Sequence, residues 1–570
     1  MAIGVQAPAS AAPPPDPITA RLTQMTLEQK VGQLFATYVY GSTATSPNAA
    51  DAAQNQSLYG VGTGAQVIAK YHLGSVIYFA WSDNVNAPAQ IAGLSNGLQQ
   101  AAADSDETPL LISTDQEGGN VTRIGAPLAV SPGNMAIGAT FSPVDSYNMS
   151  RATGQQLKAI GITVDDAPVV DVNTNPANTA DGARSFGDRA IAVSALSAAS
   201  VLGYQSAKVA ATAKHFPGLG STSINTDNGI AVTDETRAQF DRNDLPPFRA
   251  AIAAGTDEIM AAHIVAPSLD PSGAPASLSK PIVTDLLRKQ LHYDGVVVTD
   301  ALSAAALQNV EPAERAVRAV EAGVDQLLMP TSLPAAYDAV LAAVHSGRIS
   351  QARIDQSVTR LLKLKQKLGL LDNAQVDVSK VPTSVGTAQQ NAAAAQTATD
   401  SITLVRNQAH TLPLASGTGQ HVLVAGWGAG TTSTLASSIA THGVTTQRVY
   451  TGSAPSPALI DTAVAAASAS DEVVVTTNNA WGDTGQQALV KALLGTGKPV
   501  VVVSVGAPYD LAYFDAAPTY VGAYGYQPAT LDRLAAVLFG AEPGGHLPVT
   551  IHRADDPTAT LVSYGTGQRY

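Results

Sequence analysis

The feature that most constrains the fold is an alternation between short apolar runs and Ala-rich segments with helical spacing. "VAATAKHF", "DEIMAAHI" and "GVVVTD" are typical runs, and "RAVRAVEAG" and "AAYDAVLAAVHSG" are typical intervening segments. A run that is apolar throughout indicates a strand buried on both faces, as in a parallel sheet covered by helices. The alternation continues for about 350 residues, which suits a (β/α)8 barrel with insertions.

The alternation breaks in the polar, Ala-rich stretch 373–397 and then resumes with a second set of strands. This later set comprises "SITLVRN", "HVLVAG", "TTQRVY", "DEVVVTT", "KPVVVVSVG" and "TYVGAYG". We interpret it as a smaller α/β sandwich domain. The predicted organisation is therefore a disordered tail, a (β/α)8 TIM-like barrel, a linker leading into a helix, and the sandwich domain, at 1–16, 17–372, 373–397 and 398–570.

Composition excludes several classes of protein. The chain has 570 residues, which is too long for a single hydrophobic core. Acidic residues outnumber basic ones by 45 to 32, and no cluster of Lys and Arg occurs, so we expect no nucleic-acid or anionic-membrane partner. There is no cysteine, which rules out disulfides, thiolate nucleophiles and cysteine-based zinc sites. No apolar run is long enough to span a membrane.

The first residues, "MAIGVQAPASAAPPPDP", lack the charged and apolar regions of a working signal peptide. They are similar to the small-residue end of one, followed by a Pro-rich spacer. We interpret residues 1–16 as a signal-peptide remnant and expect a secreted or cell-surface bacterial protein. The alternative is a disordered cytoplasmic tail.

Polar residues follow several of the apolar runs in the first domain. Asp115 follows "LLIST", Lys214 and His215 follow "VAATA", His263 follows "EIMAA", and Asp300 follows "GVVVT". In a barrel these positions are the carboxyl ends of the strands, where barrel active sites lie. We therefore expect Lys214 and His215 to face one pocket together with Asp115 and Asp300.

Two carboxylates in one barrel mouth suggest acid/base or nucleophilic chemistry. Glycoside hydrolysis by retention needs two carboxyl groups about 5–5.5 Å apart, and Asp300 fits the nucleophile. The alternative for Asp300 is a helix N-cap, because "GVVVTD" is expected to lead straight into a helix. Asp115 lies in "STDQEGGNVTR", which is either a ligand-binding edge or an ordinary turn. Arg123 and Arg184 can donate paired hydrogen bonds to a sugar, or form surface ion pairs.

The adjacent Lys214 and His215 raise a geometric question. Neighbouring residues of a strand point to opposite faces, so both side chains reach one ligand only at a bulged or twisted strand end. Pro217, Gly218 and Gly220 provide such an exit. A Lys after an apolar run also needs a partner, and Asp115 or a ligand can supply it.

The segments "KHFPGLGST", "TDQEGG", "ARSFGD" and "GVVVTDAL" occur in the order and spacing of glycoside hydrolase family 3. The chain resembles that family over nearly its whole length, and its bacterial β-N-acetylglucosaminidase branch most closely. The resemblance implies a retaining mechanism without a metal or other cofactor, with Asp300 as nucleophile. It also implies sugar contacts from Asp115, Arg123, Arg184, Lys214 and His215.

The loop after the Lys-His pair departs from that branch, where it resembles "GHGDTxxDSH" and supplies an Asp-His dyad for proton transfer. This chain has "GLGSTSINTDNG". Leu219 and Ser221 replace a His and an Asp, Asn225 replaces the dyad Asp, and Asp227 replaces the catalytic His. The usual relay therefore cannot operate here.

Three interpretations of this change stay open. In the first, Asp227 is itself the acid/base, which requires that its pKa is raised toward the working pH. Alternatively a carboxyl elsewhere acts, as in the branches that use a Glu of the second domain, but Glu472 and Glu542 do not look like pocket residues. In the third interpretation, the protein binds a sugar and hydrolyses it poorly or not at all. Asn225 and Asp227 can bind hydroxyl groups in every case.

The sequence thus predicts a monomeric, retaining exo-β-glycosidase that acts on a carbohydrate, most simply a β-N-acetylglucosaminide. The alternatives are an exo-β-glycosidase for a different sugar with a non-standard acid/base, or a non-catalytic carbohydrate-binding homologue.

Overall fold

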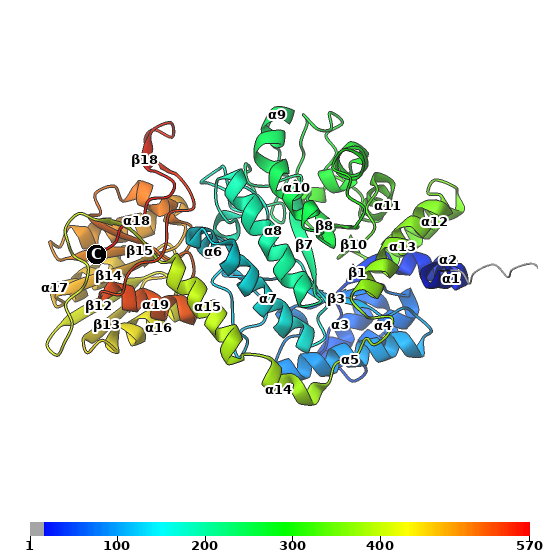
Figure 1. The fold of residues 1–570 in the computed structure, drawn as a ribbon, viewed down its shortest axis with the longest axis horizontal. Coiled ribbons are helices and arrows are strands. Elements are labelled where there is room, and N and C mark those ends of the chain that lie inside the picture. Colours follow the sequence, from blue (N-terminus) through cyan, green and yellow to red (C-terminus); the bar gives the residue numbers. More distant parts are fainter. Residues whose placement is uncertain (1–15) are drawn as a thin grey trace, which may run out of the picture.

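The computed structural model describes residues 16–570, so the predicted tail lies outside the described residues except for Asp16, which caps the first helix. Two sheets organise the chain (Figure 1). The eight-stranded sheet has the order β10-β1-β2-β3-β6-β7-β8-β9, and its strands pair in parallel. A bridge between Val298 and Gln326 joins β9 to the segment entering β10 and closes the barrel. The predicted fold class is confirmed.

The barrel strands coincide with the predicted apolar runs, with one addition. Their bounds are β1 (Phe35–Thr37), β2 (Ser75–Ile77), β3 (Leu111–Thr114), β6 (Val164–Asp165), β7 (Ala210–Phe216), β8 (Glu258–Ala261), β9 (Val296–Thr299) and β10 (Leu327–Leu328). Strand β1 was not among the predicted runs. It is short, and the apolar side chains around it belong to the same core as the neighbouring helices.

Helices surround the barrel and cover the outer faces of its strands. They are α4 (Gly64–Tyr71), α5 (Pro88–Asp104), α7 (Pro143–Ala159), α8 (Ala190–Ser206), α10 (Leu245–Ala253), a π-helical segment at Pro281–Gln290, α11 (Pro312–Ala322), α12 (Leu333–His345) and α13 (Gln351–Lys367). Short helices α1 (Pro17–Gln24), α2 (Leu27–Gly32) and α3 (Ala49–Tyr59) precede or follow β1. Because these helices bury the outer faces of the strands, both faces of each strand are buried. This explains why the runs are apolar throughout rather than alternating between apolar and polar residues.

The second sheet has the order β11-β16-β15-β14-β12-β13, with β11 antiparallel at one edge. Its strands match the second set of runs: β11 (Thr403–Asn407), β12 (His421–Gly426), β13 (Thr445–Tyr450), β14 (Glu472–Thr477), β15 (Val500–Ser504) and β16 (Thr519–Gly522). Alternate residues of β12 face opposite layers. Val422 and Val424 pack with α16 (Ala429–Ala440) and α19 (Pro528–Leu538), whereas Leu423 packs with α17 (Pro457–Ser468) and α18 (Thr484–Leu494).

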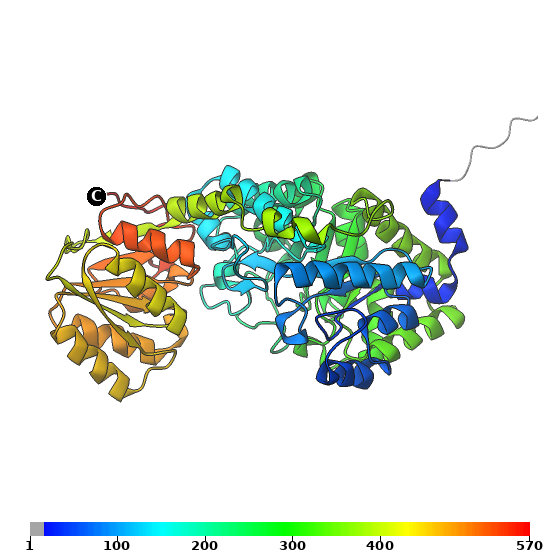
Figure 2. The same ribbon diagram turned by 90° about the horizontal axis from the view of Figure 1, so that it is seen from below.

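The two domains are joined by α14 (Val381–Ser384), which lies against α5 and α7 of the barrel, and by α15 (Ala388–Ser401), which runs from there to the second domain in Figures 1 and 2. Helix α15 packs against α6 (Asn134–Thr140) and α7 on the barrel and against α19 on the second domain. It spans the predicted boundary between 397 and 398. We propose 17–372 and 398–570 as the limits of the domains, with α15 as a packed connection.

Side chains also bridge the domains next to the barrel mouth. The Asn173 amide donates to the Tyr509 hydroxyl at 3.0 Å, and the Gln527 amide donates to the Gly119 carbonyl at 2.8 Å. Asp188 accepts a hydrogen bond from the Thr550 N–H at 2.7 Å. These contacts fix the second domain beside the loops that follow the barrel strands.

Candidate active site

A cavity of about 510 Å³ opens at the carboxyl ends of the barrel strands. Its size lies within the usual range of small-molecule sites. Every residue proposed for the site from the sequence lines this cavity: Asp115, Arg123, Arg184, Lys214, His215, Asn225, Asp227 and Asp300. The structure therefore brings together side chains from segments that are distant in the sequence.

Lys214 lies at the centre of a buried charge network in the cavity wall. Its Nζ lies 2.9 Å from Asp115 Oδ1 and 2.7 Å from Glu117 Oε1. Arg184 donates to both oxygens of Glu117, at 2.9 and 2.8 Å, and Arg123 Nη2 lies 3.3 Å from Asp115 Oδ2. Asp115 is the partner expected for Lys214, and Glu117 is a second one. The network holds three cationic groups at the cavity surface with defined orientations.

Both Lys214 and His215 reach the cavity because β7 loses its regular register there. The pairing of β7 with β8 shifts between Lys214 and Phe216. The bulged strand end inferred from the following Pro and Gly residues is thus present. A Cβ at Gly220 would collide with the Val172 carbonyl oxygen, so this exit needs a glycine.

Glu117 offers a test of the buried network through protein stability. Replacing Glu117 by Gln keeps its shape but leaves Lys214 and Arg184 beside a neutral amide. We expect the free energy of unfolding of the barrel at pH 7 to fall by about 3–5 kcal/mol, because buried charges lose a partner. Urea denaturation of the wild type and of Glu117→Gln measures this difference.

The pH dependence of that difference has a defined sign. Burial alone would raise the pKa of Glu117, but Arg184 and Lys214 outweigh it and hold the pKa well below its ordinary value of 4.5. A carboxyl with a lowered folded-state pKa stabilises fully above its unfolded pKa and progressively less below it. The difference in free energy of unfolding between wild type and Glu117→Gln should therefore become smaller as the pH is lowered from 7 to 3. An equal difference at both pH values would contradict this account.

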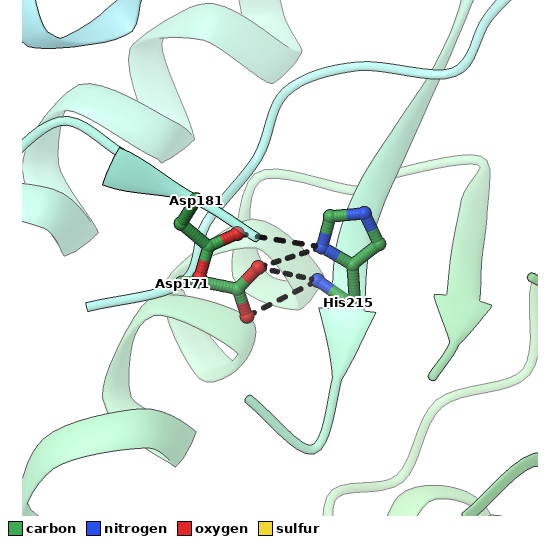
Figure 3. A group of neighbouring side chains, drawn as sticks. All are labelled: Asp171, Asp181 and His215. Carbon is green, nitrogen blue, oxygen red and sulfur yellow. Dashed lines mark hydrogen bonds and ion pairs between the residues drawn. The ribbon is translucent and has the colours of Figure 1, made fainter. Parts of the chain in front are cut away.

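His215 is oriented by two buried carboxyls (Figure 3). Its Nδ1 lies 2.7 Å from Asp171 Oδ2 and 4.0 Å from Asp181 Oδ1. Burial would lower the pKa of His215, but the Asp171 carboxylate outweighs it and raises the pKa. Burial and the charge of Asp171 raise the pKa of Asp181, which favours its neutral form. The ring is thus held with Nε2 away from Asp171.

Asp171, Asp181 and His215 also offer ligand atoms within 4.8 Å of one another, a spacing that suits a metal ion. Asp171, however, already accepts hydrogen bonds from the backbone N–H groups of His215 and Leu219 and pairs with the His215 ring. That bonding pattern is typical of an imidazole–carboxylate pair and leaves Asp171 little capacity for a cation. We therefore assign the cluster to positioning His215.

Asp300 follows β9 and lies half-buried in the cavity. Its Oδ1 accepts a hydrogen bond from the Ala301 N–H at 2.8 Å, but the next α-helix begins only at Pro312. Asp300 is therefore not a helix cap, and the expectation that a helix follows it directly is wrong, because residues 301–304 form turns. Nε2 of the buried His263 lies 2.9 Å from the Ala301 carbonyl oxygen and braces this turn.

The electrostatic surroundings favour an ionised Asp300. Burial alone would raise the pKa of Asp300, but the imidazoles of His263 and His215 and the Ala301 N–H outweigh it and lower the pKa. An anionic carboxylate is what a nucleophile in glycoside hydrolysis requires.

Asp227 lies on the loop that differs from the resembled branch, and this loop is attached to the segment after Asp300. The carbonyl oxygens of Thr226 and Asp227 accept hydrogen bonds from the N–H groups of Ala306 and Ala305, at 3.0 and 3.4 Å. Asn225 Oδ1 is committed to the loop itself, since it accepts a hydrogen bond from the Asp227 N–H at 2.8 Å. The Asp227 side chain is open to the cavity. Desolvation and the negative charge of Asp300 raise its pKa.

The second domain contributes one of the described residues that line the cavity, Asn479. It lies on the loop after β14, where the buried carboxyl of Asp510 accepts hydrogen bonds from the Thr477 hydroxyl and the Trp481 N–H at 2.8 and 3.2 Å. Glu472 and Glu542 are not among the residues that line the cavity. This arrangement argues against an acid supplied by the second domain.

The family models match the two domains separately. The description "Glycosyl hydrolase family 3 N terminal domain" applies to residues 26–364, and "Glycosyl hydrolase family 3 C-terminal domain" to residues 402–569. The chain belongs to glycoside hydrolase family 3. The predicted resemblance is thereby confirmed.

Among curated family 3 relatives, beta-hexosaminidase A of Pseudoalteromonas piscicida is 36% identical over 61% of this chain and 62% of its own length. Beta-N-acetylglucosaminidase/beta-glucosidase of Cellulomonas fimi is 30% identical over 71% of this chain and 69% of its own length. The chain thus matches less than two thirds of the Pseudoalteromonas protein. A solved family 3 beta-N-acetylglucosaminidase from Paenibacillus has a TM-score of 0.81 and 36% identity, covering 92% of this chain and 99% of that one.

The sequence analysis did not identify several residues that build or line the cavity in the structure. Glu117 lies within the quoted "TDQEGG", two residues after Asp115, and Asp171 lies inside the apolar "APVVDV". The sequence contained a signal for both residues, because a carboxylate beside or inside an apolar run needs a buried partner. Asp181 and Asn479 carry no comparable local signal, since only the tertiary fold brings them to the cavity.

Proposed function

We propose that this family 3 glycoside hydrolase removes terminal β-linked N-acetylglucosamine by a retaining mechanism in which Asp300 is the nucleophile. The observation that carries the proposal is Asp300 itself: a carboxylate with a lowered pKa in a cavity that is also lined by Arg123, Arg184, Lys214 and His215. The names of the relatives supply the sugar, since they include hexosaminidase and N-acetylglucosaminidase.

The proposed reaction proceeds in two displacements. An Asp300 oxygen attacks the anomeric carbon, the bond to the leaving oxygen breaks, and that oxygen takes a proton from the Asp227 carboxylic acid. Water then attacks the glycosyl–Asp300 ester while Asp227 accepts its proton, which releases the sugar with its configuration retained. Asp115, Arg123, Arg184, Lys214, His215 and Asn225 are proposed to contact the sugar hydroxyl and acetamido groups.

The pKa shifts of the two carboxyls agree with these roles. Asp300 has a lowered pKa and Asp227 a raised one. A pair of carboxyls whose environments separate their pKa values is the arrangement expected of a base or nucleophile and an acid in one site.

A panel of 4-nitrophenyl β-glycosides tests the substrate. We expect the highest kcat/KM for the N-acetylglucosaminide, with the glucoside, galactoside and xyloside at least about tenfold lower, because the site also binds the acetamido group. Turnover of the glucoside alone would favour the second candidate, a β-glucosidase, which is part of the Cellulomonas relative's name. Binding of a sugar without turnover of any glycoside would overturn the proposal in favour of a binding protein.

Secretion stays a prediction, because it rests on residues 1–16. Within residues 16–570, no helix is both long and apolar enough to traverse a bilayer. Activity in the culture medium of the source organism would test secretion.

A further inference from the structure

A buried carboxyl between β7 and α10 has no role in the chemistry described above. Asp244 directly precedes α10 and is 1% exposed. An Asp at this position ordinarily caps the helix, but Pro246 and Pro247 occupy the second and third helical positions and have no N–H to donate. Neither carboxylate oxygen of Asp244 has a hydrogen-bond partner among the described residues. A carboxyl buried in this way needs a partner that compensates for its lost hydration.

The Asp244 carboxyl lies against the start of the loop that carries Asp227. A Cβ placed on Gly218 would come within 2.6 Å of Asp244 Oδ1 and within 3.0 Å of its Cγ. Gly218 also has a φ of +138°, which other residues rarely adopt. The glycine therefore allows the loop backbone to approach this carboxyl closely.

A second carboxylate lies where the same loop ends. Glu235 Oε2 accepts a hydrogen bond from the Ser221 hydroxyl at 2.9 Å, and Ser221 Oγ lies 3.1 Å from Thr233 Oγ1. Glu235 thus connects the beginning of the segment 218–235 to its end. Asp227 lies between these two points.

The electrostatic surroundings of Asp244 are negative. Burial raises its pKa well above the ordinary value, and the negative charges of Glu235, Asp171 and Asp181 raise the pKa further. No basic side chain is among the main causes of this shift. A positively charged partner would therefore have to come from outside the protein.

We propose that Asp244, Glu235, Ser221 and Thr233 bind a divalent cation of the calcium type beneath the loop that carries Asp227. These side chains offer four carboxylate oxygens and two hydroxyl oxygens, and Ca²⁺ takes about six to eight oxygen ligands in flexible geometry. Mg²⁺ fits less well, because it retains several water molecules. The ion compensates for the buried charge of Asp244 and joins both ends of the segment 218–235. It takes no part in the two displacements.

Calcium binding is measured on protein that has been stripped with EDTA and then dialysed. We expect titration calorimetry to give one Ca²⁺ per chain with a Kd below about 100 µM. Addition of about 1 mM CaCl₂ should raise the melting temperature by about 3–6 °C relative to EDTA. MgCl₂ should raise it less, and NaCl or KCl at equal ionic strength should not raise it. These measurements need no glycoside, so their result is independent of the proposed function.

Asp244→Asn tests the site without relying on loss of the fold. The amide removes a buried negative charge, so in EDTA this variant should melt no lower than the wild type. Its affinity for Ca²⁺ should fall at least about tenfold, and Glu235→Gln should act in the same direction. Asp270→Asn is the matched control. Asp270 is also buried, but its oxygens accept hydrogen bonds from the Ser272 N–H at 2.9 Å and the Ser279 hydroxyl at 2.6 Å, so calcium affinity should not change.

Hydrogen exchange connects the proposed site to the loop. Ca²⁺ should slow amide exchange within residues 218–235 of the wild type but not of Asp244→Asn. Absence of calcium binding, unchanged binding in Asp244→Asn, or slower exchange only in other segments would overturn the proposal. It would also be overturned if calcium had no effect and the wild type became more stable as the pH fell from 7 to 5, because Asp244 and Glu235 would then share a proton instead of a metal ion.

Discussion

Asp300→Asn should lower kcat by at least about 1,000-fold on every glycoside that the wild type hydrolyses, because an amide cannot form the glycosyl ester. The variant keeps the shape of the side chain and its contact with the Ala301 N–H, so the fold and sugar binding should persist. Steady-state kinetics on the preferred 4-nitrophenyl glycoside measure the loss, and thermal unfolding verifies the fold.

The ester itself can be observed. A fluorinated substrate with a good leaving group slows the second displacement, and the intact mass of the wild type should then rise by one glycosyl unit. After proteolysis the added mass should map to the peptide that contains Asp300. Attachment to another carboxyl, or a loss of activity below about tenfold in Asp300→Asn, would contradict the nucleophile assignment.

Asp285→Asn is a suitable matched control for this experiment. Asp285 is an exposed carboxylate on the barrel surface, paired with Lys289 at 2.7 Å and absent from the cavity lining. The same chemical change there should leave kcat unaltered, so any loss in Asp300→Asn can be attributed to its position in the cavity.

The sequence allowed prediction of the residues that end barrel strands, and the reason is topological. Lys214, His215 and Asp300 follow apolar runs, and the carboxyl ends of parallel strands meet at one face of a barrel. Once the barrel was inferred, their convergence followed without any knowledge of side-chain contacts. The same reasoning placed Asp115 as a partner of Lys214, at 2.9 Å in the structure.

Other parts of the site depend on tertiary contacts that local patterns do not encode. Asp181 lies on a long loop and reaches His215 only through the fold, and Asn479 comes from a separate domain. Whether Asp300 caps a helix was also undecidable locally, because the residues after it include Ala and Leu, which favour helices in isolation. In the folded chain, residues 301–304 instead form a turn that is held by His263 and by the Asp227 loop.

The loss of activity in Asp227→Ala should depend on the leaving group of the substrate. Protonation of the leaving oxygen matters when the departing alcohol is a poor leaving group and hardly at all when it is a good one. For Asp227→Ala we therefore expect kcat/KM to fall by about 100- to 10,000-fold on a methyl glycoside but by less than about tenfold on a 2,4-dinitrophenyl glycoside. Because kcat/KM reports only steps through the first displacement, slow hydrolysis of the ester does not obscure the comparison.

The neighbouring Asn228 provides the control for this loop. It is exposed and does not line the cavity, so Asn228→Ala should change both substrates by the same small factor. Equal losses on both substrates in Asp227→Ala would instead mean that the loop is merely distorted, and the acid would have to be sought elsewhere. Azide tests whether Asp227 also acts as the general base in the second displacement. Because an anionic nucleophile needs no general base, azide should raise kcat of Asp227→Ala on the dinitrophenyl glycoside. The product should be a β-glycosyl azide.

The pH dependence of kcat/KM tests the roles of Asp300 and Asp227 in one measurement. The proposed mechanism requires Asp300 ionised and Asp227 protonated, so we expect kcat/KM to rise with pH as Asp300 loses its proton and to fall as Asp227 loses its own. The lowered pKa of Asp300 moves the rising limb to lower pH, and the raised pKa of Asp227 moves the falling limb to higher pH, which widens the working range. In Asp227→Ala the falling limb should disappear on the dinitrophenyl glycoside while the rising limb remains, since the protonated acid is no longer needed and the ionised nucleophile still is. A falling limb that survives unchanged would mean that another group donates the proton.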